Sequence, residues 1–309
     1  METCSWLYWC KYHLKLPDKT NDGALRGTIC HLILELLLKP RHKKHYDAIM
    51  ESKDIASSVP VNRTVIKFLK ANDAWSEENY SLCNKMIYVA LDYDYFGGEG
   101  GHIERPEEEF KIENKKPKYN IYGFIDKPVQ FKDRGFLKIV DYKTSKQKFK
   151  GDELETNIQA MMYSLAAKKL WPKLKRRVVQ FLFLKFPRSP AQELEYSDEQ
   201  LKGFEYYLER VNKIVEGFDE SAGKSDYAVH NGHKWLCGPA KSGWICPFHK
   251  PFSYYVLLDP EGNQVKSSYK NDFQPKDGHL VEERHYEGCP AKNCDAKNSL
   301  QDDDPFLDF

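Results

Sequence analysis

Two aspartates and a lysine are the residues of this sequence whose types and spacing best suit hydrolytic chemistry. Asp126 lies within the strand-like segment 121–129, and Asp141 ends the next such segment, 136–142, two residues before Lys143. Side chains two residues apart in a strand share one face, so Asp141 and Lys143 are expected side by side. Two carboxylates hold a hard divalent cation that activates water, and a lysine orients that water or stabilises the developing charge. The set predicts phosphodiester hydrolysis; the alternative is an ordinary ion pair at the end of a strand.

An alternation of helices and strands must position these residues. Apolar residues recur at helical spacing and predict helices over 24–38, 153–170 and 198–217. β-Branched and aromatic residues predict strands over 121–129, 136–142 and 178–186, with a turn at 132–135. A short strand at 109–112 and another at 254–258 are also expected, and the segment 46–95 is expected to be helical and peripheral. This order predicts an α/β fold.

Four short motifs follow one another along these elements. They are Gly27-x-x-x-His31 on the first helix, Gly123-x-x-Asp126 and Asp141-Tyr142-Lys143-Thr144 on successive strands, and Gln159-x-x-x-Tyr163 on the next helix. In this order and spacing they resemble the RecB-type branch of the PD-(D/E)xK nuclease superfamily, which includes helicase-linked recombination nucleases and CRISPR-adaptation nucleases. The resemblance covers residues 5–187. It implies a restriction-endonuclease-like core, in which helices flank a mixed central sheet.

The resemblance also implies a role for each motif residue. Mg²⁺ or Mn²⁺ would be bound by His31, Asp126, Asp141 and the backbone carbonyl of Tyr142. Lys143 would be the catalytic lysine, and Gln159 and Tyr163 would position it or the DNA backbone. Four basic residues beyond the motifs are candidate DNA contacts: Lys146, Lys148, Arg176 and Arg177.

The activity expected from the resemblance is that of a metal-dependent DNA exonuclease in recombination, repair or DNA degradation. Three alternatives stay open: a structure-specific endonuclease of the same fold, a DNA-binding or partner protein with an inactive site, and a metallohydrolase acting on a small phosphoester. DNA is the expected partner of the exonuclease, of the endonuclease and of the inactive DNA-binding protein.

Cysteines characterise the C-terminal part of the chain. The predicted organisation is a nuclease core over 1–224 with a helical insertion at about 40–100, a Cys-, Gly- and Lys-rich extension over 225–298, and a tail over 299–309. Many members of the family hold a [4Fe–4S] cluster with one cysteine before the first motif and three near the C-terminus. The candidates here are Cys10, Cys237, Cys246 and either Cys289 or Cys294, although the usual spacing around Cys246 is absent. Structural Zn²⁺ at the C-terminal cysteines and a site with neither metal are the alternatives.

Composition restricts the remaining function classes. The 309 residues include 47 Lys+Arg and 46 Asp+Glu, a formal charge of +1, which argues against a wholly basic nucleic-acid coat protein. No apolar run is long enough to span a bilayer and no signal peptide is recognisable, so a cytoplasmic protein without membrane contact is expected. The acidic, Phe-ended tail resembles the tips of single-stranded-DNA-binding proteins and is a candidate docking segment for a replication or recombination protein.

Overall fold

The chain forms two compact units in the computed structural model, which describes residues 3–18, 21–230, 232–238 and 245–291. One unit is Thr20–Lys213, and the other combines Met1–Lys19 with Ile214–Phe309. The sequence analysis assigned the N-terminal residues to the nuclease core, but the structure groups them with the C-terminal part. The reason is hydrogen bonding between segments far apart in the sequence. The Ser5 amide donates to the Asp226 carbonyl at 2.8 Å, and Trp6 Nε1 donates to the Tyr286 hydroxyl at 2.7 Å.

A five-stranded mixed sheet lies at the centre of the larger unit. Its neighbouring strands are, in order, β1 (His102–Ile103), β4 (Lys127–Phe131), β5 (Phe136–Lys143), β6 (Arg176–Phe183) and β7 (Ala191–Leu194). β5 and β6 are parallel, and the other pairs are antiparallel. Most residues of β5 and β6 are buried, and β5 carries Lys138, Asp141 and Lys143 among its apolar residues.

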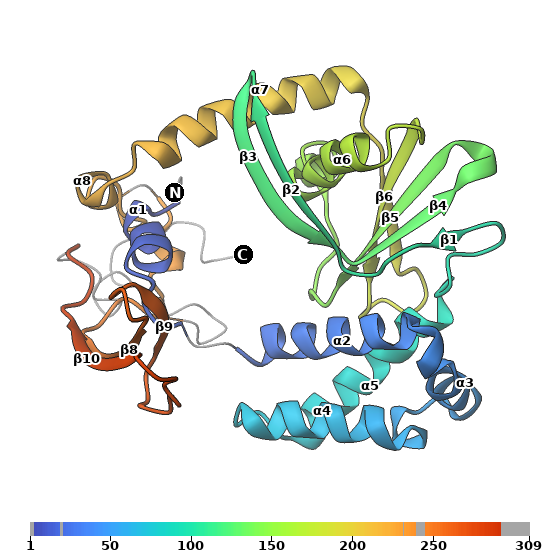
Figure 1. The fold of residues 1–309 in the computed structure, drawn as a ribbon, viewed down its shortest axis with the longest axis horizontal. Coiled ribbons are helices and arrows are strands. Elements are labelled where there is room, and N and C mark those ends of the chain that lie inside the picture. Colours follow the sequence, from blue (N-terminus) through green and yellow to red (C-terminus); the bar gives the residue numbers. More distant parts are fainter. Residues whose placement is uncertain (1–2, 19–20, 231, 239–244, 292–309) are drawn as a thin grey trace, which may run out of the picture. The chain divides into compact units, whose positions relative to one another are not determined.

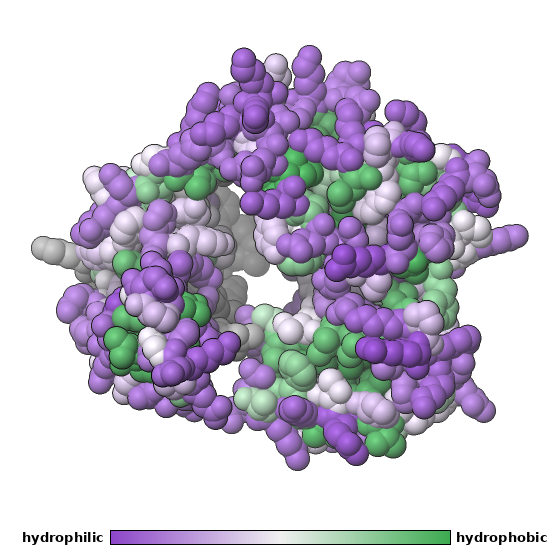
Figure 2. All heavy atoms as spheres, viewed as in Figure 1, coloured by the Kyte–Doolittle hydropathy of each residue, from purple (hydrophilic) through white to green (hydrophobic). Residues whose placement is uncertain are grey.

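Helices cover both faces of this sheet (Figure 1). On one face lie α2 (Asp22–Leu38), α3 (Lys43–Ser52), α4 (Val59–Ala71) and α5 (Glu77–Asp92), joined by the 3-10 turns η2 (Pro40–His42) and η3 (Ile55–Ser57). On the other face lie α6 (Ile158–Leu170) and α7 (Asp198–Glu216). This arrangement confirms the predicted α/β class with a mixed central sheet flanked by helices. Hydrophilic side chains cover most of the surface visible in Figure 2, as expected for a chain with 30% charged residues.

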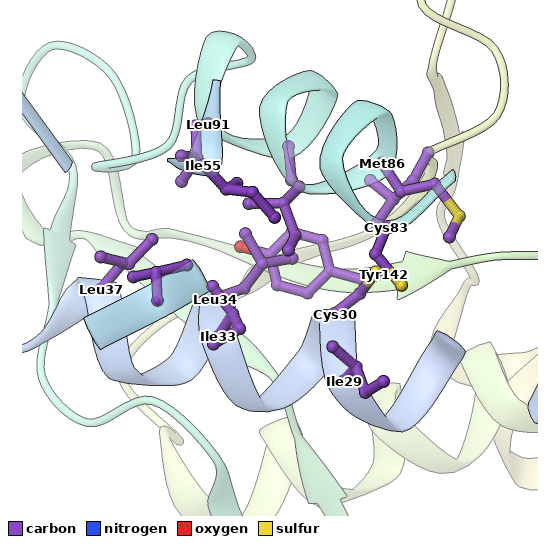
Figure 3. Close-up of a cluster of buried hydrophobic side chains, with 14 of the residues drawn as sticks. Ile29, Cys30, Ile33, Leu34, Leu37, Ile55, Cys83, Met86, Leu91 and Tyr142 are labelled. Carbon is purple, nitrogen blue, oxygen red and sulfur yellow. The ribbon is translucent and has the colours of Figure 1, made fainter. Parts of the chain in front are cut away.

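Helices α3–α5 are part of the core, so the prediction that this segment is peripheral was wrong. Val65, Cys83 and Met86 are almost fully buried and share a cluster with the apolar side of α2. Figure 3 shows side chains of α2 and of the following helices gathered around Tyr142 from β5. α3 and α4 each have an apolar face, which buries Ile49 in α3 and Val61, Val65 and Leu69 in α4.

The strand predicted over 121–129 is two strands, not one. β3 (Lys118–Ile125) pairs with β2 (Glu108–Lys115) in a separate two-stranded ribbon, and β4 belongs to the central sheet. Asp126 is the bend between β3 and β4. It therefore lies between two strands and not inside one, as the sequence analysis expected.

The predicted turn before β5 and the predicted helix after it differ from the structure only at their ends. The turn at 132–135 is the 3-10 turn η4 (Lys132–Arg134), closed by Gly135 with φ +59°. The helix predicted from residue 153 begins at Ile158, after the 3-10 turn η5 (Gly151–Leu154), because the Asn157 side chain caps it by accepting from the Ala160 amide. Ile158, the first residue of α6, is 46% exposed.

The second unit is built on a three-stranded antiparallel sheet in the order β10 (Leu280–Tyr286), β8 (Phe252–Leu258) and β9 (Gln264–Ser268). Around it lie α1 (Ser5–Tyr8), the π-helical turn η1 (Trp9–His13), α8 (Glu220–Gly223) and η6 (Lys234–Leu236). Only β8 was anticipated from the sequence. Within the described ranges, no helix combines the length and apolar character that crossing a bilayer requires.

Candidate active site

The bend at Asp126 brings that carboxylate to the C-terminal end of β5. Asp126 Oδ2 accepts from the Tyr142 amide at 2.8 Å, and its Oδ1 lies 3.2 Å from His31 Nδ1. The other ring nitrogen of His31 lies 3.0 Å from the Tyr142 carbonyl. Burial lowers the pKa of His31, but the hydrogen bond and the charge of Asp126 outweigh burial and raise it to about 9. In the metal-free chain the imidazolium therefore holds the carboxylate and the carbonyl that a cation would use.

The close approach of α2 to β5 depends on Gly27. A Cβ at this position would lie 3.1 Å from Thr144 Oγ1, tighter than ordinary contact. The absent side chain lets the helix lie against the end of the strand, and His31 follows one helical turn later on the same face.

A second group of side chains surrounds Asp141 on the face of β5 covered by α6. Lys143 Nζ lies 2.7 Å from Asp141 Oδ2 and donates to Gln159 Oε1 at 2.6 Å. Gln159 Nε2 and the Tyr163 hydroxyl both donate to Asp141 Oδ1, at 2.8 Å and 2.9 Å. Alternation along β5 and the four-residue spacing on α6 produce this network, as the sequence predicted for the relative positions.

Asp141 is 2% exposed, and burial together with the charge of Asp126 raises its pKa to about 6, against the opposing effect of Lys143. Its Oδ2 meets Lys143 as an ion pair but accepts no hydrogen bond of ordinary geometry among the described residues. A buried carboxylate oxygen without a hydrogen bond retains a lone pair for a cation.

Glu107 joins this site, and the sequence analysis missed it. One ligand atom from each of His31, Glu107 and Asp126 lies within 4.8 Å of the others. Burial and the neighbouring Asp126 raise the pKa of Glu107. Its backbone is in the left-handed region, with φ +53°, and its amide donates to the Asp126 carbonyl at 3.0 Å. No motif spacing identifies Glu107, because it is the pairing of β2 with β3 that brings Glu107 opposite Asp126. Only a prediction of the β2–β3 hairpin could have found Glu107 from the sequence.

Of the four candidate DNA contacts, Lys146 and Lys148 lie in the segment after β5, and Arg176 and Arg177 lie at the start of β6. Lys148 donates to Ser189 Oγ at 3.0 Å in the segment after β5. Arg176 and Arg177 begin β6, whose register pairs them with the start of β5, seven residues from Lys143. At about 3.3 Å per residue they lie over 20 Å along the sheet from the site. Arg176 is bonded to Glu195 there, so the structure does not extend the site to these arginines.

A group of cysteines lines an apolar pocket within the second unit. Cys4, Cys237, Cys246 and Cys289 surround it together with aromatic side chains such as Trp6 and Phe248. None of the described cysteines forms a disulfide. Cys10, the N-terminal ligand predicted from the sequence, packs in the same cluster and lies 3.6 Å from the Tyr286 hydroxyl. Burial, with smaller contributions from Cys246 and Cys4, raises the pKa of its thiol to about 12. Cys294 lies outside the described residues.

Comparison with known proteins gives one family. The model of the PD-(D/E)XK nuclease superfamily matches residues 1–249. No curated protein matches the chain significantly. The matched residues include all four sequence motifs and Glu107.

Proposed function

Because the chain belongs to the PD-(D/E)XK nuclease superfamily, we propose that it is a divalent-metal-dependent deoxyribonuclease, and specifically an exonuclease of the RecB-type branch. The observation that carries this proposal is the convergence of Asp126, Asp141 and Lys143 at one end of β5. Recombination, repair or DNA degradation is the setting that the motif resemblance favours.

The donor atoms of the site suit a hard cation. His31, Glu107 and Asp126 form one group of candidate ligands, and Asp141 Oδ2 and the Tyr142 carbonyl lie at the adjoining end of β5. Carboxylate and carbonyl oxygens with one imidazole are typical ligands of Mg²⁺ and Mn²⁺. A cation bound there would lower the pKa of a water and neutralise phosphate charge.

The protein groups around that position have separate tasks in this proposal. Lys143 reaches out of the sheet beside Asp141 and orients the attacking water or stabilises charge on the phosphate. Gln159 and Tyr163 fix the orientation of Lys143 and Asp141, since both donate to Asp141 and Gln159 also accepts from Lys143. Glu107 adds negative charge that would help to hold a cation, and without a metal the same charge favours the protonated form of His31.

Linear and closed circular DNA of one sequence, incubated with Mg²⁺ or Mn²⁺, test the activity. An exonuclease degrades only the linear form. Cleavage of the circle as well would support the endonuclease alternative, and binding of both without cleavage would support an inactive DNA-binding protein.

Two matched substitutions test the site. Asp141→Ala should abolish cleavage, and Glu107→Gln should weaken metal binding. Asp198→Ala is the control, because Asp198 forms a similar ion pair with Lys168, at 2.8 Å, on the exposed surface. Wild-type cleavage by Asp141→Ala would remove the proposed chemistry.

The cysteine-lined pocket supports a second, structural metal. We propose a [4Fe–4S] cluster held by Cys4, Cys237, Cys246 and Cys289, with Zn²⁺ as the alternative. Anaerobically purified protein should contain iron and sulfide, and Cys4→Ser should lose both while Cys83→Ser retains them. Stoichiometric zinc without iron would favour the alternative. Retention of iron by Cys4→Ser together with its loss in Cys10→Ser would return Cys10 to the ligand set.

Recruitment of a replication or recombination protein by residues 299–309 remains a proposal from the sequence alone, because these residues lie outside the described part of the chain.

A further inference from the structure

The ribbon of β2 and β3 has one buried and one exposed face. Phe110, Ile112, Tyr119 and Ile121 point to the core beneath α6. On the opposite face Tyr122 is 59% and Phe124 is 43% exposed. An antiparallel ribbon with one solvated face normally places polar residues there, so two adjacent exposed aromatic rings need a reason.

The two rings form a pair at the level of the ribbon surface. Their centroids are 5.4 Å apart and their planes are at 79°. Because the residues are two apart in β3, their Cα positions are about 6.6–6.8 Å apart along the strand. Gly123 lies between them and faces the Phe110 ring, and a Cβ on Gly123 would lie 2.8 Å from that ring. The absence of a side chain at Gly123 therefore lets the strand lie close to the core.

The exposed face continues directly into the metal-binding group. Phe124 is two residues before Asp126 and opposite Glu109 in the β2–β3 register. Two residues before Glu109 is Glu107, whose amide donates to the Asp126 carbonyl. Ligand atoms of Glu107 and Asp126 lie within 4.8 Å of each other, and one residue in each strand separates these candidate metal ligands from the Glu109–Phe124 pair.

Charge changes sign along the same ribbon. At the site end the face carries carboxylates, and at the hairpin tip it carries Lys115 and Lys118, which are paired in the register, with Lys116 between them. Lys111 lies opposite Tyr122 and is 3.0 Å from Glu113. Figure 1 shows the ribbon running from the central sheet beside α6 up to α7, so the basic tip is far from the site. A polyanion along this face would have its backbone near lysines at one end and near a metal cation at the other.

We infer that this face binds single-stranded DNA, with unpaired bases stacked on Tyr122 and Phe124 and the following phosphodiester carried to the metal site. The inference rests on the proposed function. In a duplex the base faces are already stacked on one another, whereas a single strand offers them to aromatic side chains. The face therefore selects a single strand or a frayed end as the substrate of the same site.

Binding and cleavage test the inference separately. Tyr122→Ala/Phe124→Ala is made in the Lys143→Ala background, so that binding of a fluorescent single-stranded oligothymidylate and of a blunt duplex is measured without cleavage. Trp75→Ala is the matched control, since Trp75 is 42% exposed in the turn between α4 and α5, outside the ribbon. Thermal unfolding establishes that each variant is folded.

The expected result is single-strand binding at least tenfold weaker for the ribbon variant, with little change for duplex binding or for the control. A 2-aminopurine placed in the oligonucleotide should lose its stacking-induced quenching in the ribbon variant alone. Unchanged single-strand affinity would overturn the inference, as would a change confined to oligomeric state, which would assign the face to a second copy of the chain. Cleavage of duplex DNA by the parent protein without measurable single-strand binding would overturn it while leaving the proposed function intact.

Discussion

Replacing Lys143 by methionine separates the electrostatic role of this residue from its packing. Methionine retains much of the apolar length of lysine but removes the ammonium, which lies 2.7 Å from Asp141 Oδ2. Asp141 is 2% exposed, so its charge then remains in a buried position without the ion pair. Hydrogen bonds from Gln159 and Tyr163 remain.

The magnitude follows from the pKa of Asp141, which burial and Asp126 raise to about 6. At pH 8 the ionised form is favoured over the protonated form by about 3 kcal/mol in the intact protein. This is the largest charge-related loss that the variant can suffer, because Asp141 can take up a proton instead. At pH 5 only about a tenth of the carboxyl is ionised, and the loss falls below about 0.1 kcal/mol. The stabilisation contributed by Lys143 is therefore present above pH 6 and disappears as the pH falls through 6.

Urea unfolding in EDTA at pH 5 and pH 8 measures this difference. Lys168→Met is the control: its ammonium lies 2.8 Å from Asp198, but both side chains are about half exposed, and the variant should change stability by less than about 1 kcal/mol at either pH. Cleavage by Lys143→Met should fall by at least about a hundredfold. An equal loss of stability at both pH values, or cleavage at the parent rate, would refute the reasoning.

Four further predictions concern the same site. The apparent affinity for Mn²⁺ should rise about tenfold per pH unit between pH 7 and 9, because His31, with a pKa of about 9, must release its proton. Titration calorimetry in buffers of different ionisation enthalpy measures the affinity and the proton release. An affinity that does not change with pH would contradict the prediction. In metal-free protein the same proton stabilises the fold below pH 6.5, and this contribution should be lost as the pH rises through 9. Gly27→Val should reduce the free energy of unfolding by about 1–3 kcal/mol and lower the cleavage rate, because the new side chain would collide with Thr144. Gly27→Val/Thr144→Ala should recover part of both, as measured by urea unfolding and initial rates. No recovery in the double variant would argue against this collision. Tyr163→Phe removes a 2.9 Å hydrogen bond to Asp141, so the free energy of unfolding at pH 8 should fall by about 1–2 kcal/mol, as measured by denaturation. The acid limb of the pH–rate profile, measured from initial rates, should move to higher pH.

The sequence by itself determined the residues whose positions are set by local periodicity. Asp141 and Lys143 share a strand face because side chains alternate, and Gln159 and Tyr163 share a helix face because they are four residues apart. The fold class followed from the order of such elements. These conclusions need no knowledge of distant contacts, since a strand or a helix presents the same spacing wherever it packs.

Only the tertiary structure decided the positions that depend on pairing between distant segments. The pairing of β2 with β3 brings Glu107 to Asp126, and the bend at Asp126 separates two sheets where the sequence suggested one strand. The same holds for Cys4, which reaches the C-terminal cysteines because the N-terminal residues pair with residues more than two hundred positions away. Such contacts are selected by burial and by the hydrogen bonding of the whole unit. No local pattern specifies them, because the free energy that selects them exists only when both segments are in place.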